Sequence, residues 1–119
     1  QNNVNSLILK LEETLSDKKL YHNPRLTLLD TAKELGTNRT YLSSCLNNEL
    51  HTTFYDYINS FRLKEVEEMF HSQEYINCTI EELAQKCGFN SASTFRRAFV
   101  KTYGCTPLEY RKKCEITTI

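Results

Sequence analysis

The sequence contains few residues that break helices and no long apolar run. Its 119 residues include only three Gly and two Pro, a composition that favours helix over sheet and excludes a collagen-like or low-complexity chain. The longest apolar stretches span only a few residues, as in Leu7-Ile8-Leu9. We therefore expect no membrane-spanning helix and no signal peptide. These absences together predict a globular, all-α protein with a cytoplasmic location.

Cysteines are present but lack the spacing of a disulfide framework or a zinc site. Their number is odd, no two form a CxxC pair, and the three histidines share no ligand spacing with them. We expect reduced thiols, no metal and no cofactor. Cys45 and Cys87 lie among apolar residues of helical stretches, where a free cysteine acts as a small hydrophobic side chain. The five are Cys45, Cys78, Cys87, Cys105 and Cys114.

Motifs of common enzyme classes are also missing. The sequence has no GxSxG, no HExxH, no phosphate-binding glycine loop and no convincing Cys/His nucleophile arrangement. We therefore expect that the protein is not an enzyme.

The charges balance over the whole chain but not along it. Lys plus Arg and Asp plus Glu each number 15. From Lys86 to the C-terminus there are seven basic residues and only two acidic ones, and an acidic stretch comes just before Lys86. This asymmetry fits either a basic face that binds a polyanion or an ordinary solvated surface. The acidic residues are Glu67, Glu68, Glu74, Glu81 and Glu82.

An internal repeat is the most informative feature. Residues 27–38 align with residues 79–90, with identical Thr, Ala, Gly and Asn at matching positions. After one extra residue in the second copy, the match continues through apolar positions to a Thr-x-x-acidic-Tyr pattern. The later pairs are Leu42 with Phe95, Leu46 with Phe99, Thr53 with Thr106, Asp56 with Glu109, and Tyr57 with Tyr110.

Each copy predicts a helix, a tight turn and a second helix. Thr79 with Glu82 is a capping box, which marks a helix start, and residues 27–30 form a looser version of it. Gly36 and Gly88 follow the last apolar residue of these helices, where a left-handed residue ends a helix sharply. Second helices then begin near Asn38 and Ser91. The small Ala32 and Ala84 would let the two helices cross closely, although Ala is also simply a good helix former.

One long helix is expected to connect the two copies. Phe54, Ile58 and Phe61 form an apolar stripe on its first half, and a second stripe at 63, 66 and 70 lies on the other side of its second half. The stripes predict a rigid connector that packs against both units. The predicted segments are an N-terminal helix in 1–21, a first helix-turn-helix in 22–52, the connector in 53–72, a loop in 73–78, and a second unit with a final helix in 79–113. Seven helices result.

These features resemble the DNA-binding domain of AraC/XylS-type transcription regulators, which has two helix-turn-helix motifs joined by a long helix. The most specific part is Ile80-x-x-Leu-Ala-x-x-Cys-Gly-Phe-Asn-Ser-x-Ser-Thr-Phe-Arg-Arg-x-Phe, followed by Tyr103-Gly104-Cys105-Thr106-Pro107-x-x-Tyr110-Arg111. Residues 35–43 and 54–63 are similar to a variety seen in Bacteroidetes. The sequence departs from the family pattern at three positions. His51 stands where the family often has Gly, Ser44 where it often has Arg, and Val100 where it often has Lys.

The resemblance implies that the second helix of each unit enters a major groove and reads base edges. Arg97 is the preferred base-reading residue, because a guanidinium bonds bidentately to guanine; Arg96 fits either a base or a phosphate. The first reader is expected to contribute Asn38, Arg39, Thr40, Ser43, Ser44 and, toward phosphate, Asn47. The second is expected to contribute Ser91, Ala92, Ser93, Arg96 and Arg97. Backbone electrostatics are assigned to Lys101, Arg111 and Lys112.

The implied partner is double-stranded DNA, read at two half-sites about one helical turn apart, with bending if the readers miss straight geometry. The alternative is a helical module of the same fold that binds protein, which the neutral charge, Ser44 and Val100 would suit. Because the chain begins at Gln1 rather than Met, we expect a piece of a longer regulator. Family membership implies contact with RNA polymerase, a sensor or membrane-anchored segment upstream, and any dimerisation through absent segments.

Overall fold

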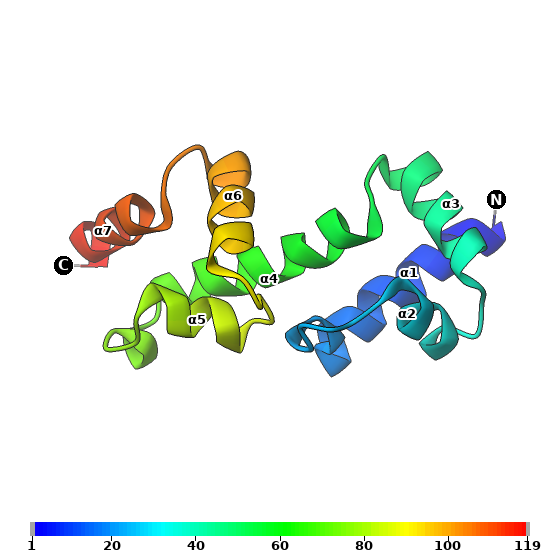
Figure 1. Ribbon diagram of the computed structural model, residues 1–119, viewed down its shortest axis with the longest axis horizontal. Helices are drawn as coiled ribbons and strands as arrows, with labels where there is room; N and C mark the ends of the chain where they lie inside the picture. The colour runs from blue at the N-terminus through cyan, green and yellow to red at the C-terminus, as the bar shows by residue number, and fades with distance from the viewer. Residues whose placement is uncertain (1, 119) are drawn as a thin grey trace. The chain divides into compact units, whose positions relative to one another are not determined.

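The fold is entirely helical in the part of the chain that can be described. A computed structural model describes residues 2–118, and within them it has seven α-helices, two short 3-10 helices and no strand (Figure 1). The expected all-α class and helix number are confirmed. No helix in this range is long and apolar enough to cross a membrane. In order, the elements are α1 (Asn2–Lys18), η1 (Leu20–His22), α2 (Leu28–Glu34), α3 (Arg39–Leu50), α4 (Phe54–Phe70), η2 (Gln73–Tyr75), α5 (Ile80–Lys86), α6 (Ala92–Tyr103) and α7 (Pro107–Thr118).

The chain divides into two compact units, Gln1–Ile58 and Asn59–Ile119, and the division falls inside α4. Phe54 and Ile58 are buried in the first unit, while Leu63 and Val66 belong to the core of the second. The expectation that one helix serves two cores is therefore confirmed. Its bounds, 54–70, lie inside the expected 53–72. The rigidity expected of this connector stays a prediction.

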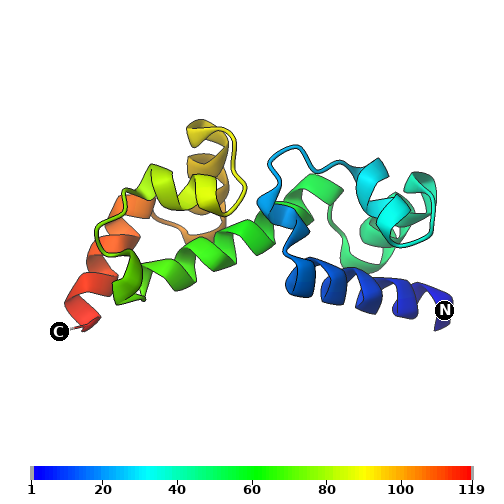
Figure 2. The same cartoon turned by 90° about the horizontal axis from the view of Figure 1, so that it is seen from below.

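The first unit is built from α1, α2, α3 and the start of α4. Leu7, Leu11 and Leu15 recur every four residues on α1 and are all buried, as a helix with one apolar face requires. Lys10 Nζ donates to the backbone oxygen of Leu35 at the end of α2, at 3.4 Å. Helix α3 packs against both α2 and α1 (Figure 2).

The second unit has a core rich in aromatic rings. Phe70 of α4, Phe95 and Phe99 of α6, and Cys87 at the end of α5 are all buried. Burying one Phe side chain stabilises a fold by about 1.5–3 kcal/mol. Cys87 and, in the first unit, Cys45 are buried as expected. Helix α6 contacts both α5 and α7, so two other helices of this unit hold it in place.

Both helix-turn-helix turns follow the geometry predicted from their glycines. Gly36 has φ 72° and Gly88 has φ 110°. The following amides, of Thr37 and Phe89, donate back to the oxygens of Ala32 at 2.9 Å and Ala84 at 3.0 Å, which is the Schellman ending of a helix. The two alanines are buried, so small side chains do lie where the paired helices meet.

Two expectations need correction. The capping box at Thr27 is complete: Asp30 N–H donates to Thr27 Oγ1 at 3.0 Å, and Thr27 N–H donates to Asp30 Oδ2 at 3.4 Å. The long return bond is still weaker than its counterpart of 2.9 Å at Thr79. The segment 73–78 is not plain loop, because η2 lies within it, and η1 was not expected. Single turns of this kind carry no apolar period that a sequence reading can detect.

Candidate nucleic-acid interface

The two expected reading helices, α3 and α6, begin at side-chain caps. Asn38 Oδ1 accepts the backbone N–H of Tyr41 at 2.8 Å, and Ser91 Oγ accepts that of Thr94 at 3.3 Å. Each cap satisfies one of the free N–H groups of a first helical turn. Ser91 Oγ also lies 3.0 Å from Ser93 Oγ. The caps fix where each helix starts, and therefore which side chains lie at its N-terminal end.

Helix α3 has one buried and one polar face. Leu42, Cys45 and Leu46 are buried against the first unit. Every residue that the sequence assigned to the first reader is exposed, so the structure brings these residues to one accessible surface. They are Asn38, Arg39, Thr40, Ser43, Ser44 and Asn47.

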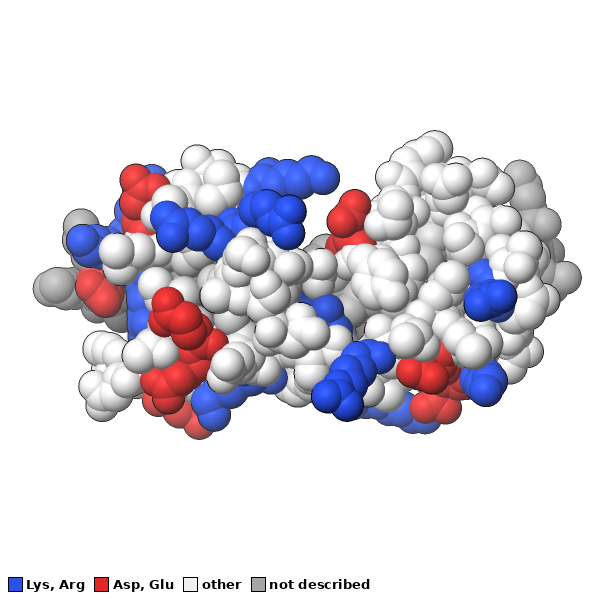
Figure 3. All heavy atoms as spheres, in the orientation of Figure 1, with Lys and Arg blue, Asp and Glu red and all other residues white. Residues whose placement is uncertain are grey.

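Helix α6 has the same division and more charge. Phe95 and Phe99 are buried, and Ser91 at the start is half-buried. In Figure 3, Lys and Arg atoms gather over α6, while Asp and Glu atoms gather over α5 and the segment before it. The second unit therefore presents a basic helix, α6, beside an acidic band. The exposed predicted residues of α6 are Ala92, Ser93, Arg96, Arg97 and Lys101.

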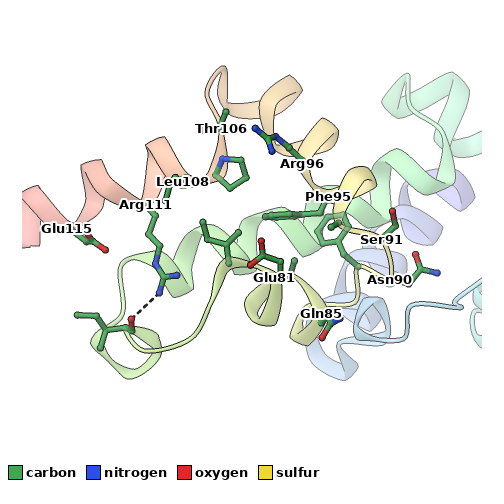
Figure 4. A pocket seen from close by; sticks show the side chains of 16 residues that line it. Glu81, Gln85, Asn90, Ser91, Phe95, Arg96, Thr106, Leu108, Arg111 and Glu115 are labelled. Atoms are coloured by element: carbon green, nitrogen blue, oxygen red, sulfur yellow. Dashed lines mark hydrogen bonds between the residues drawn. The ribbon is translucent and has the colours of Figure 1, made fainter.

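Arg96 and Arg97 differ in their surroundings. Arg96 lines a groove of about 640 Å³ between α5, α6 and the start of α7, and Arg97 is not among the residues that line it. In the close view, Arg96 extends from α6 toward the beginning of α7, where Thr106 and Leu108 lie (Figure 4). The two neighbouring arginines thus have separate positions on the helix, and they can serve different contacts.

Arg111 has structural partners that the sequence did not reveal. Its Nη2 donates to the backbone oxygens of Tyr75 at 3.0 Å and Ile76 at 3.3 Å, and the second of these bonds is drawn in Figure 4. Its guanidinium carbon also lies 5.6 Å from the centre of the Phe70 ring. Arg111 therefore ties α7 to η2 and α4. Its predicted contact with the DNA backbone stays a prediction, as does that of the exposed Lys112.

A polar network fastens α7 to the end of α4. Tyr110 Oη donates to Glu67 Oε2 at 2.7 Å, and His71 Nε2 lies 2.9 Å from the same oxygen. The bond to the Glu67 carboxylate, followed by burial, raises the pKa of Tyr110. The Tyr110 and Phe99 ring centres lie 5.5 Å apart, so α7 helps to hold α6.

The start of α7 is a third capping box, which the sequence analysis missed. Thr106 N–H donates to Glu109 Oε1 at 2.9 Å, and Glu109 N–H donates to Thr106 Oγ1 at 3.2 Å. The bond from the Thr106 backbone is the main reason that the pKa of Glu109 is lowered, and Thr79 lowers the pKa of Glu82 in the same way. The Thr-x-x-Glu spacing of residues 106–109 would have revealed this box.

Comparisons with known proteins agree on one family. A family model described as a helix-turn-helix domain matches residues 31–113. An uncharacterised HTH-type transcriptional regulator of Bacillus subtilis, YtdP, is 30% identical over 88 residues, or 74% of this chain and 11% of the relative. The Msm operon regulatory protein of Streptococcus mutans is 26% identical over 116 residues, or 88% of this chain and 41% of the relative. The chain therefore spans less than half the length of either curated relative.

Solved structures share the fold. A transcriptional regulator from Chromobacterium violaceum, described as containing an AraC-type DNA-binding domain, superimposes with a TM-score of 0.71 at 24% identity. The match covers 88% of this chain and 91% of that one. This similarity shows that the two chains share their fold.

Proposed function

The chain belongs to the AraC-type family of helix-turn-helix transcription regulators, and we propose from this that it binds a defined double-stranded DNA site and regulates bacterial transcription. The observation that carries the proposal is the repeated unit with its two reading helices. In both units the polar face of the second helix is exposed, and its apolar face is buried in a separate core. A helix-turn-helix uses such an exposed helix to enter a major groove.

In this proposal, the basic residues of α6 make different contacts with DNA. Arg97 reads a base edge, because its guanidinium can donate two parallel bonds to guanine O6 and N7. Arg96 holds a phosphate, since it lies on the side of α6 that faces the start of α7. Lys101, one turn beyond Arg97 and exposed, adds attraction to the DNA backbone without base preference.

The first reader relies on smaller groups. Arg39 is the only charged side chain among its predicted contacts, and the others are amides and hydroxyls. Such groups bond to bases or phosphates over short distances and contribute little long-range attraction. We therefore propose that affinity comes mainly from the second unit and that the first unit adds sequence preference.

Finer features of a regulator are proposed on the same family membership. We propose that the DNA-bound protein contacts RNA polymerase and that it acts in the cytoplasm, where bacterial DNA lies. Dimerisation, where it occurs, is assigned to segments outside this chain. Sedimentation of the chain alone should then show a monomer.

The test is selection from a random duplex library with the wild-type chain, followed by affinity measurements on the selected duplex at several salt concentrations. Arg97→Ala should relax one base position in one half of the site, with a loss of about 1–3 kcal/mol in discrimination. Arg96→Ala should weaken binding evenly over all sequences and reduce the salt slope by about 1. A duplex with a scrambled site is the control.

Two outcomes would contradict the proposal. If no sequence is enriched and binding stays weak at low salt, a protein-binding module becomes the better reading of the fold. If Arg96→Ala relaxes a base position and Arg97→Ala does not, the roles assigned to the two arginines are reversed.

A further inference from the structure

Arg62 is a buried charge within α4. Only 6% of it is exposed, and among the described residues the only other buried polar or charged one is Thr31. Burial lowers the pKa of the Arg62 guanidinium. A buried charge costs free energy unless neighbouring groups compensate for it, so the contacts of Arg62 indicate what it does.

Those contacts lead to the turn before α6. Arg62 Nη1 donates to Asn59 Oδ1 at 2.8 Å, and the guanidinium carbon lies 5.9 Å from the centre of the Phe89 ring. Phe89 is itself buried, and its backbone N–H donates to the backbone oxygen of Ala84 in the last turn of α5. An arginine placed over an aromatic face is attracted by the charge distribution of the ring.

Phe89 in turn contacts α6. Its ring meets that of Phe95 on α6 edge to face, with centres 5.1 Å apart. Two residues after Phe89, Ser91 caps α6. The guanidinium of Arg62 thus lies beside the turn at residues 89–91, from which α6 begins.

Within residues 2–118, no aromatic ring occupies the corresponding place in the first unit. Thr37 occupies the place of Phe89 in the repeat, so no ring is present there. In the first unit, Lys10 Nζ donates to the backbone oxygen of Leu35 at 3.4 Å, and Lys10 is exposed. The guanidinium of arginine is planar and pre-organised, whereas the ammonium of lysine lies at the end of four flexible methylenes.

We infer that Arg62 is a positioning residue for the second reader: packed against Phe89, it fixes the turn at residues 89–91 and so sets where α6 presents its side chains to DNA. The inference rests on the proposed function. It follows from the geometry because recognition requires contact groups to be held within about 0.5 Å by residues behind them.

The test compares Arg62→Met with Lys64→Met, an exposed charge on the same helix. Affinity is measured for the selected duplex and for duplexes with single base changes in either half. Arg62→Met should lower discrimination in the half read by α6 by at least about fivefold, the lower end of what one bidentate contact supplies. The other half should be unaffected, and Lys64→Met should change neither half.

A second readout does not require DNA. The amide of Thr94, which bonds to the Ser91 cap, should exchange with solvent faster in Arg62→Met than in wild type. Arg62→Lys keeps the charge but not the planar guanidinium, so it should restore only part of the protection. If Arg62→Met proves too unstable, Phe89→Leu removes the ring with Arg62 intact and should give the same defect in the same half-site.

Equal losses in both half-sites, or unchanged discrimination and unchanged Thr94 exchange, would overturn the role given to Arg62. These results differ from failure of the proposed function, in which the wild-type chain itself selects no duplex. In that case the Thr94 exchange alone decides whether Arg62 positions α6.

Discussion

His51 adopts a conformation that favours glycine. It ends α3 with φ 52° and ψ 42°, and the corresponding end of α6 has Gly104 at φ 76°. The left-handed region costs a residue with a Cβ about 1–2 kcal/mol. His51 stands where the family frequently has Gly, and its left-handed backbone explains why that position prefers Gly.

His51→Gly should therefore stabilise the chain. The relief of the left-handed strain exceeds the entropy cost of a new glycine, about 0.4–1 kcal/mol, so we expect a net gain of about 0.5–1 kcal/mol in urea unfolding. The matched variant is Gly104→Ala, which should lose about 1 kcal/mol although nothing lies within 4 Å of an added Cβ. A destabilised His51→Gly would show that the imidazole makes a contact that outweighs the strain.

Single residues were predictable where exposure follows from helix periodicity. The assigned positions on α3 and α6 face solvent because the apolar residues between them fix the buried side. Arg62 and Arg111 were not assigned structural roles, since a charged residue is normally exposed. Their partners, Phe89 and the oxygens of Tyr75 and Ile76, come from segments distant in sequence.

Among the elements, helix ends were the most predictable feature. Caps and left-handed glycines act within four residues, so the sequence near Thr79, Gly88 and Ser91 contains the information for each boundary. The two apolar stripes of α4 also predicted that this helix packs into the cores of both units. The short helices η1 and η2 were not predicted, because a single turn has no apolar period, although Ser72 Oγ does accept the backbone N–H of Glu74 at the start of η2.

Tyr57 of α4 should make the first unit sensitive to alkali. Burial, with a smaller effect of Glu12, raises the pKa of Tyr57 to about 12. The folded state thus holds this proton more tightly than the unfolded state, whose tyrosine has a pKa near 10. The resulting stability is fully present below about pH 10 and is lost as the pH rises toward 12.

Tyr57→Phe should reduce this alkaline loss. In thermal unfolding between pH 9 and pH 12, the wild type should lose more stability than the variant. The difference should be about 1 kcal/mol at pH 11, since the Tyr57 hydroxyl is buried and at this pH only part of the pKa difference between the folded and unfolded states affects stability. Tyr55→Phe, at an exposed position of the same helix, is the control. Parallel loss in all three proteins would contradict the role given to Tyr57.

At the scale of the whole molecule, the charge distribution matters more than the total. The chain is formally neutral, yet α6 presents Arg96, Arg97 and Lys101 at exposed positions. Exposed charges act over about 8–10 Å at physiological salt, so the acidic residues of α5 limit the basic field to the region around α6. Such a field favours one orientation on DNA over general adhesion to it.

The central claim is that one chain reads two half-sites through α3 and α6. The most direct measurement is the affinity for the selected duplex with base pairs inserted between its halves. Half-sites about one turn, roughly 34 Å, apart lie on the same face of the duplex. Five added base pairs should reduce the affinity to that of a single half-site. Ten added base pairs return the half-sites to the same face, one turn further apart, so they should restore part of the affinity only if α4 bends or unfolds. Affinity independent of the spacing would contradict the account, because the two readers would then not bind together.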